Sequence, residues 1–527
     1  MASIQTGPAA RRGQALPVHG GTVAQTAYGK LRGTEIADGV IAWRGIPYAR
    51  APLGELRLRP PQAPESWSGV RDAAEYGNRS LQPEPDPSLP ATSEDCLYLN
   101  VTAPAGAVNR PVLFWVHGGG FQKGEGTYQA GDGVAFARSH GIVVVTFNYR
   151  LGALGFLDVP GERPTGAFGL HDQIAAMRWT HQNIAAFGGD PGQITIYGLS
   201  AGGKTVTNLL ASPLTRGLIR RAAESSGGEQ LKDEPQAREL TERFLGALGT
   251  TAERIRAVPA ADILAAQIAV LAPPRSEWLW RPSIDGTALK SDPVTAIANG
   301  AAAGIPLLLQ TCAHEAAYFE VLTGDAAQQT DRVLDEYFGT AGRDRLLAAY
   351  AANHPGLDDT ALRVAIMTDE RYVIHTERLA DAHSAHAPVW RSRYDGPYTG
   401  RLANPRLAAH IKQLRACHTS DGVGIWEGGE GIAENLHYAW GAFATAGDPG
   451  WPPYTPDTRP AMIFGDHAGP NLSDDPFAPC RAAWKGLTWQ PGTWWAYWRG
   501  LAGHRNAEVR CMLHGRRDIE HDRVTGP

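Results

Sequence analysis

The sequence predicts an α/β fold: a central, buried and mostly parallel sheet flanked by helices. Short apolar runs at Val112–Val116, Ile142–Phe147 and Ile305–Gln310 are bounded by glycine and separated by stretches with helical character. A further run, Ile194–Tyr197, leads through a glycine-rich corner directly into a helical stretch. Near-continuous apolar runs of this length are typical of parallel strands that helices cover on both faces.

The chain before these runs predicts an antiparallel opening. Short β-type runs at Thr22–Tyr28 and Val40–Trp43 alternate with glycine turns. Residues 50–68 are rich in proline and are expected to cross the surface as an irregular segment. Residues 83–90 are expected to form a loop of Pro, Asp and Ser residues.

Several stretches after the second apolar run predict helices. Ala167–Ala186, Leu240–Leu248 and Ala260–Leu271 come first along the chain. Residues 325–385 are helix-rich, and helices inserted into an α/β sheet usually form a cap over its site. The four helices expected there are Arg332–Tyr337, Arg343–Ala352, Thr360–Ile366 and Glu370–Ala382.

The last part of the chain is expected to add strands to the sheet. Pro388–Tyr394 and Ala461–Phe464 predict two further strands, and Arg415–Ser420 is expected in a loop after a helical stretch. Ala482–Trp498 is expected to form a terminal helix rich in tryptophan.

The order of these elements predicts one domain over residues 21–510. Helical cap insertions are expected around residues 235–300 and 325–385. Residues 1–20, rich in Ala, Gly and Pro, are expected to be a loose leader, and residues 511–527 a polar tail.

The composition narrows the possible partners. The net charge of −5 and the pI near 6.4 show no basic surplus, and the sequence has no Lys/Arg stripe of the kind that nucleic-acid binding needs.

The N-terminus lacks the apolar core of a secretory signal, and no apolar run reaches about 18 residues, so we expect a cytoplasmic protein without a membrane span. The cysteines are too scattered for a disulfide framework or a structural zinc site, and they are Cys96, Cys312, Cys417, Cys480 and Cys511.

The glycine-rich corner, Gly198-Leu199-Ser200-Ala201-Gly202, has the G-x-S-x-G pattern between a strand and a helix. This context holds a serine in a strained conformation at the sheet edge, beside the unpaired N–H groups of a helix start. The pattern alone is weak, because a chain with 61 glycines contains it by chance about 0.4 times. It therefore needs a base, an acid and an oxyanion hole to carry a function.

The stretch His117–Phe121 supplies candidates for the oxyanion hole. Its three glycines directly follow a predicted buried strand. Such a run lets backbone N–H groups turn toward one point, where they act together with the N–H of Ala201.

An acid and a base follow Ser200 in the chain order that this type of site requires. Glu315 comes just after the Ile305–Gln310 strand, and His418 lies in a later loop that we expect at the same sheet edge. The residues alone leave competitors open: Glu320 for the acid, and His410 and His437 for the base.

Over about residues 22–500, the chain resembles the type-B carboxylesterases of the para-nitrobenzyl esterase and cholinesterase group. The resemblance implies an α/β-hydrolase fold with Ser200 as nucleophile, Glu315 as acid and His418 as base. The matching motifs occur in the family's order: Arg44–Ala49, Ser93–Val101, His117–Phe121, Asn148–Leu151, Phe187–Pro191, Gly198–Gly203, Ala439–Gly447 and Trp451–Tyr454.

The same resemblance implies an oxyanion hole from the N–H groups of Gly119, Gly120 and Ala201, and a supporting role for Ser226. It implies hydrolysis of a small-molecule ester through an acyl-enzyme, with no metal or organic cofactor. Lys123, Trp278 and Trp280 are further candidates for the substrate pocket, although solvation of the lysine and packing of the tryptophans explain them as well.

The chain departs from the family pattern at four places. Leu199 stands where the family has Glu before the nucleophile, which weakens the case for a cationic substrate. Ser80 replaces the first cysteine of a family disulfide and leaves Cys96 unpaired. Ala316 follows the acid in place of Gly, and Thr419 follows the base in place of Gly.

Two alternatives remain at this stage. The same machinery hydrolyses carbamate or amide bonds, and the sequence does not separate these from esters. A non-catalytic binding protein of the same fold is the other, and the presence of Ser200, Glu315 and His418 argues against it.

Overall fold

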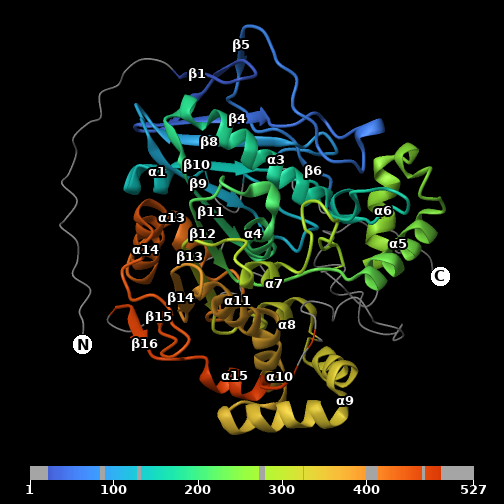
Figure 1. Ribbon diagram of the computed structural model, residues 1–527, viewed down its shortest axis with the longest axis vertical. Helices are drawn as coiled ribbons and strands as arrows, with labels where there is room; N and C mark the ends of the chain where they lie inside the picture. The colour runs from blue at the N-terminus through green and yellow to red at the C-terminus, as the bar shows by residue number, and fades with distance from the viewer. Residues whose placement is uncertain are drawn as a thin grey trace, which may run out of the picture.

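An eleven-stranded sheet forms the centre of the computed structural model (Figure 1), which describes residues 22–83, 89–127, 132–271, 279–324, 326–398, 413–465, 469–487 and 489. Its strands are β3 (Thr34–Ala37), β4 (Val40–Pro47), β8 (Tyr98–Pro104), β9 (Arg110–Val116), β10 (Val143–Phe147), β11 (Gly189–Leu199), β12 (Arg221–Ser225), β13 (Leu307–Cys312), β14 (Val389–Tyr394), β15 (Ala461–Phe464) and β16 (Asn471–Ser473). Their order is β16-β15-β14-β13-β12-β11-β9-β10-β8-β4-β3. The expected leader (residues 1–20) and tail (residues 511–527) lie outside the described residues.

The sheet is mostly parallel, as the apolar runs predict. Every neighbouring pair from β15 to β10 is parallel, whereas β16, β8, β4 and β3 pair antiparallel. The antiparallel opening is also confirmed, although its two predicted runs belong to different sheets. The small sheet consists of β1 (Val23–Gln25), β2 (Lys30–Arg32) and β5 (Val70–Asp72), and a further pair joins β6 (Arg79–Ser80) to β7 (Thr92–Ser93).

Strand β12 was not expected from the sequence. Its residues, RAAES, have the composition of a surface segment, yet every one of them is buried. The Glu224 carboxylate accepts hydrogen bonds from Thr207 Oγ1 at 3.1 Å and from the N–H of Gly228 at 3.0 Å. A buried strand can hold a carboxylate when partners of this kind satisfy it, and a hydrophobicity pattern does not reveal those partners.

Helices cover both faces of the sheet. They are α1 (Val134–His140), α2 (Gly152–Phe156), α3 (Phe168–Asn183), α4 (Ala201–Ala211), α5 (Glu234–Leu248), α6 (Ala260–Leu271), α7 (Pro293–Ala298), α8 (Ala317–Thr323), α9 (Ala326–Asn353), α10 (Asp359–Thr368), α11 (Ile374–Ser384), α13 (Gly422–Glu427), α14 (Ile432–Ala446) and α15 (Ala478–Trp484). A π-helical turn, Asp369–Val373, joins α10 to α11.

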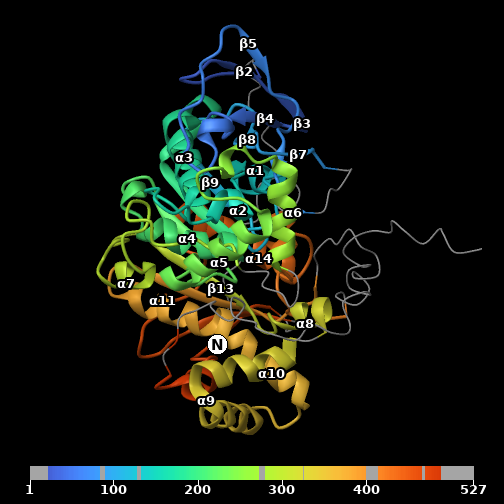
Figure 2. The ribbon, with the colours of Figure 1, turned by 90° about the vertical axis from the view of Figure 1, so that its right-hand side faces the viewer.

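Side chains of strand β9 pack into different hydrophobic clusters on the two faces of the sheet. Phe114 packs in a hydrophobic cluster that includes residues of α3 and α4, whereas Trp115 packs in a second cluster with residues of α1 and α14. Successive side chains of a strand point to opposite faces, so one apolar strand contributes to both clusters. Seen from the side, the small sheet and the helices α9 and α10 lie at opposite ends of the molecule (Figure 2).

The predicted helices are found: α6 has the predicted bounds, and the others differ at one or both ends. Helix α5 begins at Glu234, six residues before the predicted start, because Asp233 and Gln236 form a capping box there. Helix α9 is interrupted at Gly339, where φ is 64° and ψ is 172°, so the two separate helices expected in that stretch are present on either side of the break.

The predicted terminal helix over Ala482–Trp498 is wrong in its extent. Helix α15 begins earlier, at Ala478, and ends at Trp484. Lys485 has extended backbone angles and Gly486 has φ 79°, a left-handed conformation that stops a helix. Residues 490–498 lie outside the described part of the chain.

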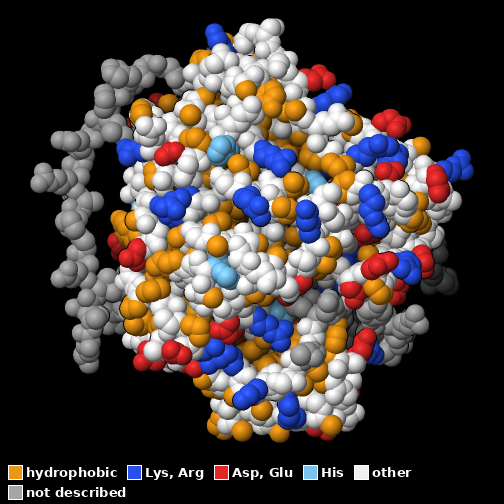
Figure 3. Space-filling view, in the orientation of Figure 1, with side chains coloured by type: hydrophobic (Ala, Val, Ile, Leu, Met, Phe, Trp, Pro, Cys, Tyr) orange, Lys and Arg blue, Asp and Glu red, His pale blue; other side chains and the backbone are white. Residues whose placement is uncertain are grey.

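The mixture of charged side chains at the surface agrees with the small net charge of the sequence. On the face shown in Figure 3, basic and acidic side chains are interspersed with apolar ones. Among the described residues, no helix is long and apolar enough to cross a membrane, and no cluster of three His, Cys, Asp or Glu side chains could hold a metal ion. The four cysteines in this part of the chain are unpaired, and Cys511 lies outside it.

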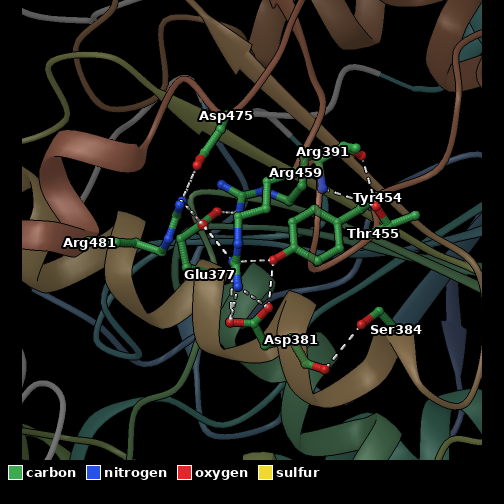
Figure 4. Close-up of polar contacts among 10 residues, drawn as sticks. Glu377, Asp381, Ser384, Arg391, Tyr454, Thr455, Arg459, Asp475 and Arg481 are labelled. Carbon is green, nitrogen blue, oxygen red and sulfur yellow. Dashed lines mark hydrogen bonds and ion pairs between the residues drawn. The ribbon is translucent and has the colours of Figure 1, made fainter. Parts of the chain in front are cut away.

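A buried carboxylate ties the C-terminal elements to the sheet. Glu377 of α11, with a side chain 3% exposed, meets three arginines that come from β14, from the segment before β15 and from α15 (Figure 4). Arg481 lies 2.9 Å and Arg459 3.5 Å from Oε2, and Arg391 donates to Oε1. Arg391 is itself buried, so its charge depends on this carboxylate.

The variant Glu377→Gln is expected to lower the free energy of unfolding by about 3–5 kcal/mol, because it leaves buried arginine charge uncompensated. Denaturant unfolding followed by circular dichroism measures this loss. Asp475→Asn is the matched control: it removes a partner of Arg481 whose side chain is 31% exposed, and it should cost at most about 1 kcal/mol. Equal stability of Glu377→Gln and the wild type would contradict the assignment.

Candidate active site

Ser200 occupies the corner between β11 and α4, as the sequence predicts. Its backbone angles are φ 60° and ψ −121°, a combination that residues with a Cβ rarely adopt. The N–H of Ser200 donates to the carbonyl of Ser225 at 2.9 Å, which ties the corner to the end of β12.

Three glycines provide the space for this corner. A Cβ on Gly198 would lie 2.1 Å from the carbonyl oxygen of Gly202, and a Cβ on Gly202 would lie 2.0 Å from the carbonyl oxygen of Val116. A Cβ on Gly118 would lie 3.1 Å from the Cβ of Ser200. At Gly198 and Gly202 the obstacles are backbone atoms of packed segments, so no side-chain movement could relieve the clash.

The structure brings together Ser200, His418 and Glu315, which are far apart in the sequence. Nε2 of His418 lies 2.8 Å from Oγ of Ser200, and Nδ1 lies 2.6 Å from Oε2 of Glu315. The three residues are 7%, 4% and 0% exposed, respectively. Glu315 follows β13 and His418 precedes α13, so both lie in turns at the end of the sheet where Ser200 stands.

Two further donors fix the carboxylate of Glu315. Its Oε1 accepts from Oγ of Ser226 at 2.7 Å and from the N–H of Cys312 at 2.8 Å, which leaves Oε2 for the imidazole. Because a carboxylate accepts at Nδ1 of His418, that nitrogen carries the ring proton and Nε2 can accept from the Ser200 hydroxyl. Ser226, the residue expected to support the site, therefore contacts the acid directly.

The glycine loop after β9 lies against the corner. Gly119, Gly120 and Phe121 have φ of 107°, 62° and 60°, a run of left-handed residues that turns the backbone back on itself. Within the described residues, the N–H groups of Gly119, Gly120 and Ala201 have no hydrogen-bond acceptor. These groups are therefore available to an acceptor at Ser200.

His117 anchors the start of this loop. It is fully buried, its Nδ1 lies 2.8 Å from the carbonyl oxygen of Gly118, and its ring stacks on Tyr149 with the centroids 4.3 Å apart. The Tyr149 hydroxyl donates to the carbonyl of His117 at 3.0 Å. Burial lowers the pKa of His117 to about 4, so the imidazole stays neutral and serves the loop as a packing group.

Aromatic rings surround the imidazole of His418. The ring of Tyr372, from the π-helical turn, lies 4.9 Å from it between centroids, and that of Phe319, from α8, lies 5.3 Å from it. Sequence reasoning did not identify either residue. No motif marks them, because aromatic residues in helical stretches most often pack a core.

A second buried acid, Asp421, also escaped the sequence analysis. It is fully buried and accepts hydrogen bonds from Oγ of Ser225 and Nε2 of Gln310. Burial raises the pKa of its carboxyl group. Asp421 lies three residues after His418, so these bonds tie the turn of the candidate base to strands β12 and β13.

Thr419, next to His418, holds a strained backbone. Its φ is 69°, which a β-branched residue rarely adopts. Three other non-glycine residues with positive φ belong to this site: Phe121, Ser200 and Ser226. Strain of this kind collects at functional sites, where the surrounding structure imposes it.

Of the three competing residues, the structure describes Glu320 and His437. Glu320 lies in α8, five residues after Glu315, and it is the carboxylate of Glu315 that contacts the imidazole of His418. Nδ1 of His437 lies 2.8 Å from the carbonyl oxygen of Ile425, and its ring packs against Phe136 in α1. His410 lies outside the described residues.

The candidate pocket residues have different surroundings. Lys123 is exposed beside the glycine loop, and its N–H donates to the carbonyl of Gly119 at 3.1 Å. Leu199 is buried next to Ser200. Trp280 is fully buried and packs edge-to-face on Phe244, so it belongs to the core, and Trp278 lies outside the described residues.

The chain is similar to known carboxylesterases in both sequence and structure. Residues 20–469 match the model of the carboxylesterase family. The chain is 34% identical to para-nitrobenzyl esterase of Bacillus subtilis (86% of this chain, 96% of the relative) and 34% identical to fumonisin B1 esterase of Sphingopyxis macrogoltabida (85% and 87%). A solved structure of Geobacillus stearothermophilus carboxylesterase superimposes with a TM-score of 0.76 at 37% identity, covering 88% of this chain and all of that one.

The variant Gly202→Ala is expected to lower the free energy of unfolding by about 1–3 kcal/mol, because its Cβ would overlap the carbonyl of Val116. Urea unfolding monitored by tryptophan fluorescence measures this. Gly422→Ala is the matched control: a Cβ there would meet Leu199 at an ordinary 3.6 Å within a helix, and no loss is expected. If both variants match the wild type, the corner is not the tight contact described above.

Proposed function

Because this chain belongs to the carboxylesterase family and is a carboxylic-ester hydrolase, we propose that it works by a serine mechanism through an acyl-enzyme. Ser200 is the nucleophile, His418 the general base and Glu315 the acid that orients the base. The observation that carries this proposal is the hydrogen-bonded series from the Ser200 hydroxyl through both imidazole nitrogens to a buried carboxylate.

The reaction begins when Oγ of Ser200 attacks the ester carbonyl and Nε2 of His418 takes its proton. The imidazolium that forms is stabilised by Glu315, which Ser226 and the Cys312 N–H hold in place. His418 then returns the proton to the leaving alcohol. Water, activated by the same imidazole, attacks the acyl-enzyme and releases the acid and the free Ser200 hydroxyl.

The negative charge on the carbonyl oxygen needs donors that are fixed in advance. We assign this role to the N–H groups of Gly119, Gly120 and Ala201. Two lie in the left-handed loop after β9 and the third at the start of α4. The close approach of Gly118 and Gly202 to the corner supports this assignment, because it holds both segments beside Ser200.

The substrate is a small-molecule ester whose groups these surroundings would select. Leu199 is apolar and buried, so the pocket next to the nucleophile has no carboxylate there to attract a cationic alcohol. Lys123 lies exposed beside the glycine loop, where it would meet an anionic group of the substrate. The helices within residues 235–300 and 325–385 would act as the cap, and the contact of Tyr372 with His418 supports this role for the second group.

The variant Ser200→Ala is expected to lower kcat for p-nitrophenyl butyrate by about 10⁴-fold or more, and to abolish labelling by a fluorophosphonate. Ser212→Ala is the matched control, because Ser212 follows the opposite end of the same helix α4 and caps only a short turn. Wild-type activity or labelling in Ser200→Ala would refute the assignment of the nucleophile.

Matched substrates separate the proposed ester preference from the alternatives. Ester, carbamate and amide derivatives of one nitroaromatic leaving group are compared by kcat/KM in the wild type. Turnover that is fastest for the ester supports the proposal, and faster turnover of the carbamate or amide would replace it. A binding protein without catalysis would react with neither the substrates nor the fluorophosphonate.

A further inference from the structure

Lys204 is a buried lysine one helical turn from Ser200. Its backbone N–H donates to the carbonyl of Ser200 at 2.9 Å, and the residue is 1% exposed. Lysine is almost never fully buried unless its charge is paired. A lysine in this position therefore needs partners inside the protein.

The ammonium group joins three segments of the chain. Lys204 itself belongs to α4, and its Nζ donates to the carbonyl of Gly227 at 2.9 Å and to the carbonyl of Arg371 at 3.3 Å. Nζ also lies 5.0 Å from the ring centroid of Tyr372, within the range of a cation–π contact. One side chain thus connects the helix after the nucleophile, the turn after β12 and the π-helical turn.

Each of these segments holds a part of the active site. Helix α4 follows Ser200 directly, and the turn after β12 carries Ser226, which donates to the triad acid. The π-helical turn carries Tyr372, whose ring packs on the imidazole of His418. A π-helical turn inside a longer helix often marks a functional position.

Two glycines let the first two segments approach closely. A Cβ on Gly203 would lie 2.8 Å from the Cα of Gly227, and a Cβ on Gly227 would lie 2.5 Å from the carboxylate of Glu224. With no side chains between the backbones, Lys204 reaches the carbonyl of Gly227 directly. The Glu224 carboxylate lies behind this turn and accepts the N–H of Gly228 at 3.0 Å.

We propose, building on the serine mechanism proposed above, that Lys204 is a positioning residue whose charged ammonium holds the Ser226 turn and the Tyr372 turn in place around the triad. It touches neither substrate nor the reacting atoms. Loss of its charge or of its donors loosens the acid and the base together, so the chemical step slows while substrate binding is little changed.

The surroundings of Lys204 make this role depend on pH. Burial lowers the pKa of Lys204 to about 8, although Glu224 opposes that shift, and burial raises the pKa of Glu224 to about 7. The ammonium is therefore charged at neutral pH and loses its proton in mildly alkaline solution. The other titratable or charged groups that act on it or feel its charge are Glu315 after β13, Glu370 and Arg371 of the π-helical turn, and His375 of α11.

Steady-state kinetics of Lys204→Met and Lys204→Arg with p-nitrophenyl butyrate test the proposal. Lys204→Met, which keeps the length but not the charge, is expected to lower kcat about tenfold or more with KM within about twofold of the wild type. Lys204→Arg keeps a permanent charge and the donors, and it should recover most of kcat. Wild-type kcat in Lys204→Met would overturn the proposal.

The pH profile separates positioning from a merely structural role. Wild-type kcat should fall above about pH 8 as the ammonium is deprotonated, and this alkaline decline should disappear in Lys204→Arg because guanidinium keeps its proton. An alkaline profile of Lys204→Arg identical to that of the wild type would overturn the proposal. This comparison also decides the matter if Lys204→Met does not fold.

Lys232→Met is the matched control. Lys232 is 3% exposed and donates to the carbonyl of Phe156, but its contacts lie outside the triad segments. It should lower the unfolding temperature without changing kcat per folded molecule or the alkaline profile. If Ser200→Ala is inactive and the wild type is active, the serine mechanism stands, and the Lys204 variants then test this inference alone.

Discussion

The whole site depends on two backbone segments that approach one another without side chains between them. Gly202 at the start of α4 lies so close to the carbonyl of Val116 at the end of β9 that no other residue fits. This contact brings the glycine loop and the start of a helix to the same point, with Ser200 strained between them. Backbone groups held this rigidly are preorganised, which is how a protein stabilises charge that develops during a reaction.

These backbone constraints also explain which parts of the fold and of the site could be predicted from the sequence. Glycines at forced positions between a strand and a helix are visible in the sequence, so Ser200 could be proposed from the residues alone. Glu315 and His418 could be named only as candidates among competitors, and the resemblance to a family selected them. Strand β12 could not be predicted, because its Glu224 is satisfied by partners that no local pattern reveals. Tyr372 was equally hidden, since nothing local distinguishes an aromatic ring that meets an imidazole from one that fills a core.

The protein interior next to the site contains buried charged side chains, which the apolar strands of the sheet do not lead one to expect. Asp421, Glu224 and Lys204 are each almost fully buried, and each is hydrogen-bonded to groups on more than one element. Satisfied networks in a low-dielectric interior rigidify a structure and specify one arrangement of it. The turns that carry Ser226 and His418 are attached to these buried polar groups, which hold the two turns in addition to the hydrogen bonds among Ser200, His418 and Glu315.

The strand order has a consequence for how the protein is made. Strands β13 and β14 are neighbours in the sheet, yet all of residues 313–388 separate them in the chain. At about 5–20 residues per second, a ribosome needs about 4–15 s to pass from one to the other. For that interval the nascent sheet ends in the unpaired, apolar edge of β13, a surface that invites misassociation. The β13 edge therefore depends for its cover on β14, a segment that is made later in synthesis.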